Sequence, residues 1–315
     1  MPKVSICIPT YNRSHYLKIA LDSVFQQTYS DFEIIVCDDG STDETPTLMS
    51  QFSDPRLLYI RHPENIGKSN NMRSGFLAAT GEFFIKFDDD DRLTPTFLEQ
   101  TVPILENNSQ IDFVATDHWI INSVNQRDID QTNLNSKKWG RTQLKSGIIP
   151  NLLEVIFIQQ SIQIGATLFR YQALKDVDFM RSNFQSCEDN DLLVRLALAG
   201  KQAYYLPERL MEYRVHPEQQ EIKKAIFHLR SKLRYLNSYQ FDSSPLEAVR
   251  HSRLQETKLL LGLRLTEIGQ TSEGQKLLWQ VRSLAPAKTG IGLTISLFPP
   301  PWRPYIFAWL RQRQA

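Results

Sequence analysis

The stretch GEFFIKFDDDDRLTP, residues 81–95, places four aspartates directly after a short apolar run. The run at 83–87 is long enough for a buried strand, and the aspartates at 88–91 begin where that strand would end. Adjacent carboxylates repel one another, and confinement raises their pKa unless a cation lies among them. The stretch therefore predicts either a solvated acidic loop or a site that binds a cation.

Three earlier apolar runs resemble this one, at residues 3–9, 33–39 and 57–62. Nearly continuous apolar runs are typical of strands in a parallel sheet that is covered on both faces. Amphipathic spacing from Ser14 onward, with Ser14 as its N-cap, and the segment 67–80 predict helices between these strands. The alternation predicts a parallel α/β sheet with right-handed crossovers.

Polar residues follow three of the predicted strands at the point where each strand ends: TYNR at 10–13, DDGS at 38–41 and DDDD at 88–91. In open α/β sheets, ligands bind outside the carboxyl ends of the strands. We therefore expect the three segments to meet at one rim. Carboxylates there suit Mg²⁺ or Mn²⁺ with coordination positions left for substrate phosphates, which favours a nucleotide diphosphate as ligand.

The rest of the chain shows a second set of patterns. Thr94 and Pro95 predict the start of a helix, and residues 122–147 are polar and predict an irregular surface region. Strands are expected at 111–117, 163–170 and 202–216, with a helix at 190–200 that ends at Gly200. From about 219 to 285 the pattern is helical, with a hairpin turning near residues 269–274.

Composition and charge bound the function only loosely. The 315 residues carry a formal net charge of +1, which gives no information about polyanion binding. Residues 1–220 hold 21 Lys and Arg against 29 Asp and Glu, whereas residues 221–315 hold 15 against 6. A basic C-terminal third suggests a tail that meets an anionic surface, and equally a solvated basic helical face.

The three cysteines and the lack of targeting patterns in the sequence indicate the cellular compartment of the protein. Cys7, Cys37 and Cys187 are widely spaced, and two of them lie in apolar runs, which favours buried, reduced thiols. The N-terminus lacks the pattern of a signal peptide, and no apolar run reaches the roughly 18–20 residues of a spanning helix. We expect a cytoplasmic protein.

Two common nucleotide motifs are excluded. No GxGxxG follows a predicted strand, which leaves a dinucleotide site unsupported. GKS at 67–69 resembles the end of a P-loop, but His62 stands where the motif requires its first glycine. The acidic run also lacks the glycine of a calcium-binding EF-hand loop.

Four ordered motifs together resemble family 2 glycosyltransferases, which are inverting enzymes of the GT-A fold: SICIPTYNR, IIVCDDGSTDET, NIGKSNNMRSGFLAATGEFFIKFDDDD and CEDNDLLVRLALAG. The resemblance covers roughly residues 3–216. It implies a GT-A domain with a Rossmann-like mixed sheet at 1–218, divided into a nucleotide-binding half at about 1–117 and an acceptor half at about 118–218. Residues 219–315 are then a helical C-terminal extension with a basic, aromatic tail.

The resemblance also implies a set of donor-binding residues. The nucleotide-binding set is Pro9, Thr10, Tyr11, Asn12, Asp39, Lys68, Asp88 and Asp89. Asp39 would bond the base, and Asp88 would face the ribose or a metal-bound water. Asp90 would bind Mn²⁺ or Mg²⁺, His216 would complete the metal or diphosphate site, and Arg214 would help to hold phosphate.

The segment CEDNDLL resembles the Glu-Asp motif whose aspartate is the catalytic base in the family. The resemblance assigns the base to Asp189 and the shaping of the acceptor site to Glu188. Transfer needs a carboxylate within hydrogen-bond reach of the acceptor hydroxyl, on the face opposite the departing nucleotide. The alternative is a purely structural role, because acids are favoured in the first turn of any helix.

The implied function is a metal-dependent inverting glycosyltransferase. It would transfer a sugar from a nucleotide-diphosphate sugar, most commonly a UDP-sugar, to a hydroxyl group of a carbohydrate or lipid-linked acceptor. The setting would be the synthesis of a cell-surface polysaccharide, lipopolysaccharide or glycolipid, and no nucleic acid partner is expected. The alternatives are a non-catalytic sugar-nucleotide and metal-binding module, and a sugar-nucleotide pyrophosphorylase. A pyrophosphorylase would want a glycine-rich loop after the first strand, and PTYNRSHY contains no glycine.

The last segment, at 290–315, mixes aromatic and aliphatic residues with arginines and is interrupted by three consecutive prolines. One expectation is peripheral contact with the inner face of a membrane, with Trp302, Tyr305, Phe307 and Trp309 at the level of the headgroups. The other is packing of this tail against the protein itself.

Overall fold

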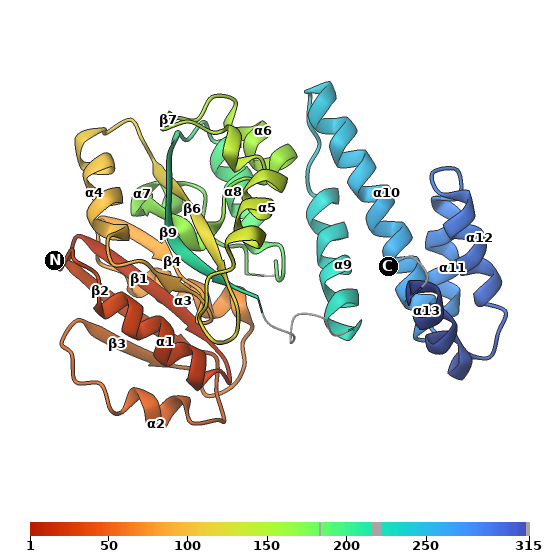
Figure 1. Ribbon diagram of the computed structural model, residues 1–315, viewed down its shortest axis with the longest axis horizontal. Coiled ribbons are helices and arrows are strands. Elements are labelled where there is room, and N and C mark those ends of the chain that lie inside the picture. The colour runs from red at the N-terminus through yellow and green to blue at the C-terminus, as the bar shows by residue number, and fades with distance from the viewer. Residues whose placement is uncertain (183, 216–221, 313–315) are drawn as a thin grey trace. The chain divides into compact units, whose positions relative to one another are not determined.

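The structure is a computed structural model that describes residues 1–182, 184–215 and 222–312. The chain divides into two compact units, Met1–His216 and Pro217–Ala315. The first unit is built around a mixed β-sheet, and the regular elements described in the second are all helices or 3₁₀ turns (Figure 1).

The sheet of the first unit has the strand order β3-β2-β1-β4-β8-β6-β9-β5, and β7 also pairs with β9. Strands β1 to β4 run parallel, β8 is antiparallel to both β4 and β6, and β9 is parallel to β6. The strands are β1 Val4–Thr10, β2 Phe32–Asp38, β3 Leu57–Arg61, β4 Phe83–Lys86, β5 Arg92–Leu93, β6 Phe113–Ile121, β7 Gly147–Ile148, β8 Thr167–Arg170 and β9 Ala203–Arg214.

Helices cover both faces of the parallel part of this sheet (Figure 1). Side chains of β1 alternate between the faces: Ile6 and Ile8 belong to the core that α1 and α4 complete, and Cys7 points to α3. The helices of the first unit are α1 Ser14–Phe25, α2 Thr45–Met49, α3 Lys68–Ala78, α4 Phe97–Asn107, α5 Ile129–Lys138, α6 Leu152–Glu154, α7 Tyr171–Asp176 and α8 Glu188–Leu198.

The predicted strands at 3–9, 33–39 and 57–62 are confirmed to within one residue. The predicted N-cap is wrong, because Ser14 is already helical and its N–H donates to Asp43 Oδ2 at 3.0 Å. Helix α4 begins at Phe97, two residues after the expected Pro95. In the first turn of α4, Leu98 N–H likewise donates to Gln27 Oε1 at 3.1 Å, so both helix starts are bonded to segments distant in sequence.

The expectation of an irregular region at 122–147 is wrong. It contains α5, a 3₁₀ turn at Arg141–Gln143 and β7. Asp128 caps α5 by accepting from Gln131 N–H at 2.9 Å, and Thr132 and Ser136 form its buried side. A helix whose buried side chains are hydroxyls has no apolar periodicity, and this explains the error.

The second unit is a helical array with small apolar clusters. Its elements are α9 Ile222–Asn237, α10 Ser244–Glu267, α11 Thr271–Gln280, α12 Pro286–Ile295, the 3₁₀ turn Pro300–Trp302 and α13 Arg303–Gln312. The predicted hairpin is confirmed: α10 and α11 are joined through Gly269, whose φ is +86°. Phe307 is buried, so its expected place at a membrane surface is wrong. Within the described ranges, every helix is too short or too polar to cross a membrane.

Candidate active site

The carboxyl ends of β1 and β2 lie side by side, because Thr10 pairs in register with Asp38. After β1 the chain turns at Asn12, whose φ of +52° is left-handed, a conformation that asparagine tolerates better than most residues. Asn12 N–H donates to Ser41 Oγ at 2.9 Å, and its Oδ1 accepts from Thr42 N–H at 2.8 Å. These bonds join two of the predicted nucleotide-binding loops and leave the Tyr11 side chain 46% exposed between them.

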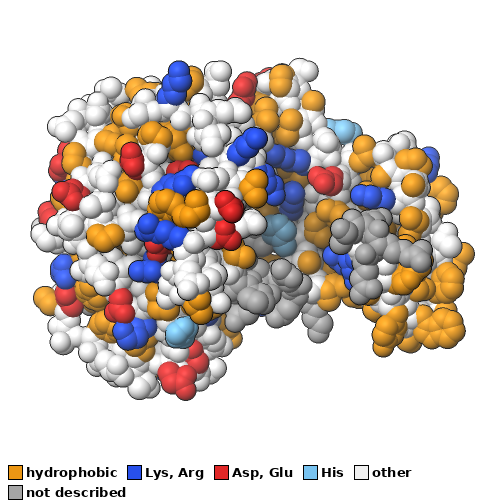
Figure 2. Space-filling view, in the orientation of Figure 1, with side chains coloured by type: hydrophobic (Ala, Val, Ile, Leu, Met, Phe, Trp, Pro, Cys, Tyr) orange, Lys and Arg blue, Asp and Glu red, His pale blue; other side chains and the backbone are white. Residues whose placement is uncertain are grey.

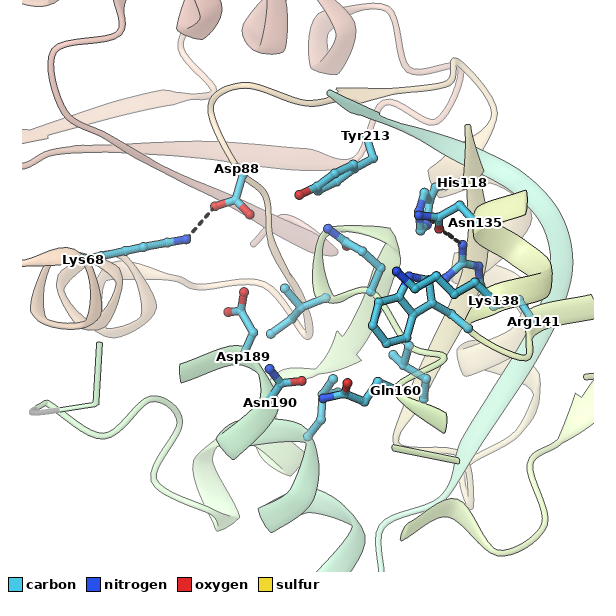
Figure 3. A pocket seen from close by; sticks show the side chains of 15 residues that line it. Lys68, Asp88, His118, Asn135, Lys138, Arg141, Gln160, Asp189, Asn190 and Tyr213 are labelled. Atoms are coloured by element: carbon cyan, nitrogen blue, oxygen red, sulfur yellow. Dashed lines mark hydrogen bonds and ion pairs between the residues drawn. The ribbon is translucent and has the colours of Figure 1, made fainter. Parts of the chain in front are cut away.

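Asp39, the predicted partner of the base, is buried directly after β2. Its two oxygens accept from Ile66 N–H at 2.7 Å and from Gly67 N–H at 3.1 Å. Gly67 has a φ of +87° and immediately precedes α3, so these bonds fix the start of that helix. Asp39 therefore positions Lys68, whose side chain points toward the end of β4 (Figure 3).

Two lysines hold Asp88 at the end of β4. Lys86 is completely buried, and its Nζ lies 2.7 and 2.6 Å from the two oxygens of Asp88. Lys68 Nζ lies 3.2 Å from Asp88 Oδ1. Burial alone would raise the pKa of Asp88, but the charges of Lys68 and Lys86 outweigh it and hold this pKa well below its usual range.

Lys86 also reaches the predicted catalytic base, since its Nζ lies 3.3 Å from Asp189 Oδ2. Burial alone would lower the pKa of Lys86, and the charges of Asp189 and Asp88 reverse this and raise it. One buried ammonium group thus holds together a carboxylate from the end of a strand and a carboxylate from the start of α8. The other oxygen of Asp189 has no hydrogen-bond partner among the described residues.

The first turn of α8 does not use its acids as caps. Cys187 occupies the N-cap position without a side-chain bond, and Asp189 turns to Lys86 instead. Glu188 is buried, and burial raises its pKa although Lys68 lies 3.5 Å from its Oε1. Asp189 thus makes an ion pair with Lys86 and no capping bond, while its charge still lies in the first turn of α8, where acids are favoured.

The next three aspartates share fewer cations. Arg13 Nη1 lies 2.7 Å from Asp90 Oδ2 and 3.3 Å from Asp89 Oδ1. Burial and the charge of Asp90 raise the pKa of Asp89 to about 7, and the same causes raise that of Asp91. Asp91 Oδ1 accepts from Arg214 N–H at 2.9 Å, whereas its buried Oδ2 has no partner among the described residues.

Arg214 at the end of β9 supports this acidic turn. Its Nε donates to the Asp90 carbonyl at 2.6 Å, and its Nη1 donates to the Asn122 carbonyl at 2.9 Å. The side chain is buried, so these bonds serve the shape of the turn. The predicted phosphate contact of Arg214 stays a prediction, and His216, which is predicted to complete the metal or diphosphate site, lies outside the described residues.

The acidic turn fits a hard divalent cation held by few protein groups. Within the described ranges, no three carboxylate, imidazole or thiol groups are grouped so that they could hold a metal ion together. Mg²⁺ and Mn²⁺ are commonly held by one or two carboxylates plus substrate phosphates. Arg13 contacts both Asp89 and Asp90, and the buried Oδ2 of Asp91 accepts no hydrogen bond from a described residue, so the turn holds carboxylate oxygens whose charged form a bound cation would favour.

A cavity of about 590 Å³ opens beside these carboxylates (Figure 3). Lys68, Asp88 and Asp189 lie on one side of it, and His118, Asn135 and Arg141 lie on the other (Figure 3). Its remaining lining residues are Lys138, Trp139, Gln160, Ile162, Gln163, Ile164, Asn190, Leu193 and Tyr213.

Sequence reasoning missed most of the far wall and also missed Lys86. The wall comes largely from α5 and the turn after it, in the region that was expected to be irregular. For Lys86 a signal existed: a single lysine inside the apolar run FFIKF must be buried with a partner. No such signal marks Arg13 or Arg141.

Solved structures establish the class of fold. The chain resembles residues 1–349 of S. aureus TarS in complex with UDP-GlcNAc, with a TM-score of 0.63 and 18% identity over 93% of this chain and 90% of that one. It also resembles the mannosyltransferase PcManGT of Pyrobaculum calidifontis, in complex with GDP-Man and Mn²⁺, with a TM-score of 0.59 and 17% identity over 95% and 81%. The fold is that of the GT-A glycosyltransferases.

Residues 5–161 match the model of glycosyl transferase family 2, and the chain belongs to this family. It is 29% identical to an uncharacterized glycosyltransferase of Haemophilus influenzae over 221 residues, which are 69% of this chain and 67% of that one. It is 32% identical over 120 residues to the UDP-Glc:alpha-D-GlcNAc-diphosphoundecaprenol beta-1,3-glucosyltransferase WfgD of Escherichia coli, covering 38% of this chain and 47% of WfgD. This chain thus matches less than half the length of WfgD.

Proposed function

We propose that this glycosyltransferase inverts the anomeric carbon of a sugar carried by a nucleotide diphosphate, most commonly UDP, as it transfers the sugar to a hydroxyl acceptor. The supporting observation is the contact of buried Lys86 with both Asp88 and Asp189. It brings the predicted donor-binding strand end and the predicted base to one cavity. A sugar between them would have the nucleotide on one side and Asp189 on the other.

The proposed step is a direct displacement. Asp189 accepts the proton of the acceptor hydroxyl while that oxygen forms a bond to the anomeric carbon. The bond from this carbon to the diphosphate oxygen breaks, and the nucleotide diphosphate leaves with the electron pair. The transition state resembles an oxocarbenium ion, as in glycoside hydrolysis, and no covalent intermediate with the enzyme is formed. Lys86 holds Asp189 in place, and Asp189 Oδ1, which is buried and makes no hydrogen bond to a described residue, would accept the hydroxyl proton.

The donor side would use the rim of the sheet. Tyr11 and Asn12 would contact the nucleotide, Asp39 would accept from the base, and Lys68 would approach the phosphates. Asp90 would hold Mn²⁺ or Mg²⁺, with neighbouring aspartates in support. When bound, such an ion offsets the charge on the leaving diphosphate.

The acceptor we propose is a carbohydrate or a lipid-linked saccharide, in the synthesis of a polysaccharide or glycolipid. The name of WfgD specifies a diphosphoundecaprenol acceptor. A 40% identical match over 96 residues, spanning 30% of this chain and 31% of the relative, is to a GalNAc(5)-diNAcBac-PP-undecaprenol beta-1,3-glucosyltransferase of Campylobacter jejuni. Lipid-linked substrates of this kind would bring the enzyme to a membrane surface.

The second unit offers a surface for peripheral membrane contact. Hydrophobic side chains gather over the C-terminal helices, at the lower right of Figure 2. The exposed large hydrophobic residues of the chain from 297 onward include Leu297, Phe298, Trp302, Tyr305 and Trp309. Tryptophan and tyrosine favour the headgroup level of a bilayer, and the basic composition of residues 221–315 favours an anionic one.

The test replaces the base while keeping its shape. We expect Asp189→Asn to bind the donor as the natural protein does, shown by an equal thermal shift with UDP- or GDP-sugars and Mn²⁺. Transfer should fall at least about 100-fold, within the range of general base catalysis. Asp130→Asn, an exposed acid in the first turn of α5, controls for effects on helix dipoles. Near-normal transfer by Asp189→Asn would reject the assignment, and donor binding without transfer by the natural protein would favour a binding module.

A further inference from the structure

We propose that the cavity beside Asp189 is an acceptor subsite for an uncharged pyranose ring, with Trp139 as its stacking surface and with Gln160 and Asn190 as its hydrogen-bonding groups. This inference rests on the proposed function and adds the residues that would hold the acceptor sugar. The carrying observation is that these three side chains line the same 590 Å³ cavity as Asp189.

The size and lining of the cavity suit one or two sugar rings. Small-molecule sites of about 300–1,000 Å³ combine apolar and aromatic walls with a few polar groups that fix orientation. Here Trp139, Ile162 and Leu193 supply apolar surface. Asp189 provides the carboxylate toward which the reacting hydroxyl would point (Figure 3).

The backbone at Gln160 is unusual in a way that serves this cavity. The π-helical turn Val155–Gln159 ends at Gln160, which has left-handed φ and ψ of +55° and +40°. Such a conformation is unfavourable for a residue other than glycine, and π-turns recur at functional sites. The turn presents the Gln160 amide to the cavity, where Figure 3 places it near Asn190.

The two amides are available to a ligand. Neither Gln160 nor Asn190 makes a side-chain hydrogen bond to another described residue, and both are half-buried. An amide group carries both donors and an acceptor, which matches a sugar hydroxyl that can donate and accept. The face of Trp139 is the apolar complement, because the C–H faces of a pyranose can pack on an aromatic ring.

The charges of the far wall argue for an uncharged ligand. Arg141 is buried and donates to Asp117 Oδ1 at 2.6 Å, and it also donates to Asn135, so its charge is balanced within the protein. Burial and the Arg141 charge lower the pKa of His118 to about 3, so this imidazole is neutral at physiological pH. Lys138 is exposed, with its Nζ 5.1 Å from the Trp139 ring. A phosphate on the ligand would find no buried, uncompensated cation on this wall.

The experiment measures binding of simple glycosides by saturation-transfer NMR. The probes are the methyl glycosides of glucose, galactose and N-acetylglucosamine, compared with the corresponding sugar 6-phosphates. We expect at least one neutral glycoside to bind, and Trp139→Ala to weaken it at least about tenfold. The matched control is Trp279→Ala, an exposed tryptophan on α11 of the second unit, which should change nothing.

A second variant separates binding from folding. Gln160→Gly removes the amide and the cost of the left-handed conformation, so the protein should be at least as stable while glycoside binding weakens several-fold. Binding that both variants leave unchanged would overturn the inference, and so would sugar phosphates that bind more tightly than neutral glycosides or an absence of binding by every glycoside. The thermal shift with nucleotide sugars is measured in parallel. If nucleotide sugars cause no thermal shift in the natural protein, the proposed function is rejected. If they cause a shift but no glycoside binds, this inference alone is rejected.

Discussion

Lys86 carries a charge in a place from which water is excluded. Burying an ammonium group is costly unless carboxylates surround it, and here Asp88 and Asp189 do so. Removing the lysine would leave two neighbouring carboxylates without their shared cation. The residue therefore links the integrity of the fold at β4 to the position of the predicted base.

His118 allows a pH-dependent prediction at the same scale. Its pKa is about 3 in the folded protein, whereas an unfolded histidine titrates near 6.5. Below about pH 6.5 the unfolded chain binds a proton that the folded protein does not, so stability falls as the pH falls. Between pH 7.5 and 5 this group should cost about 2 kcal/mol, and His118→Gln should lose that much less.

The measurement is urea unfolding of both proteins at the two pH values, taking the difference between their losses. Other titrating groups are common to both proteins and cancel in this comparison. Equal losses in the natural protein and in His118→Gln would show that His118 is protonated in the folded state.

At this scale the sequence indicated the acids of the site better than their partners. Asp88 and Asp189 stand in recognisable motifs, and the structure brings both to one lysine. Arg13 reaches across 76 positions to Asp89, a pairing that no local pattern encodes. Tertiary contacts of this kind follow from the sheet order and were beyond reach.

Among the elements, α3 packs unusually close to the sheet. A Cβ added at Gly75 would lie 2.2 Å from Cys7 Sγ and 2.6 Å from Cys37 Sγ, and both sulfurs are buried. We expect Gly75→Ala to lower the free energy of unfolding by about 1–3 kcal/mol, because the helix must move off β1 and β2. Urea unfolding measures it.

The control is Gly290→Ala in α12, where an added Cβ meets nothing within 4 Å. Alanine favours a helix interior over glycine, so this variant should be unchanged or more stable by up to about 1 kcal/mol. A Gly75→Ala protein as stable as the Gly290→Ala protein would mean that α3 sits farther from the sheet than described.

The elements were predictable where burial leaves an apolar pattern. Strands β1, β2 and β3 are apolar runs, and the alternation with helices gave their order. Helix α5 was not predicted because Thr132 and Ser136 form its buried side. Most of the far wall of the cavity comes from this helix and the turn after it, and so it was not predicted either. The antiparallel β8 between β4 and β6 could not be inferred, since local sequence does not state which strands are neighbours.

For the whole molecule, the contrast between an acidic first unit and a basic second one leads to a test of membrane contact. We expect the double variant Leu297→Ser with Trp302→Ser to bind anionic phospholipid vesicles at least about tenfold more weakly than the natural protein, in a sedimentation assay. The two side chains are 81% and 62% exposed, so the fold should not suffer. Vesicle binding should weaken because serine buries less apolar area in the bilayer than leucine or tryptophan does.

The matched control replaces Leu77 and Val124 of the first unit by serine, since these are also highly exposed apolar residues. Vesicle binding by this control should equal that of the natural protein. If both double variants bind equally well, the aromatic helices do not contact lipid and the acceptor must be reached in another way.

Strand β9 ends at Arg214, the residue whose backbone and side chain hold Asp91 and Asp90. It is also almost the last residue of the first unit, whose boundary falls at His216. The polypeptide therefore leaves this unit from the same spot at which the aspartate turn is anchored. A substitution that shifts the backbone at Arg214 would therefore act directly on both Asp91 and Asp90, because one residue holds the two of them.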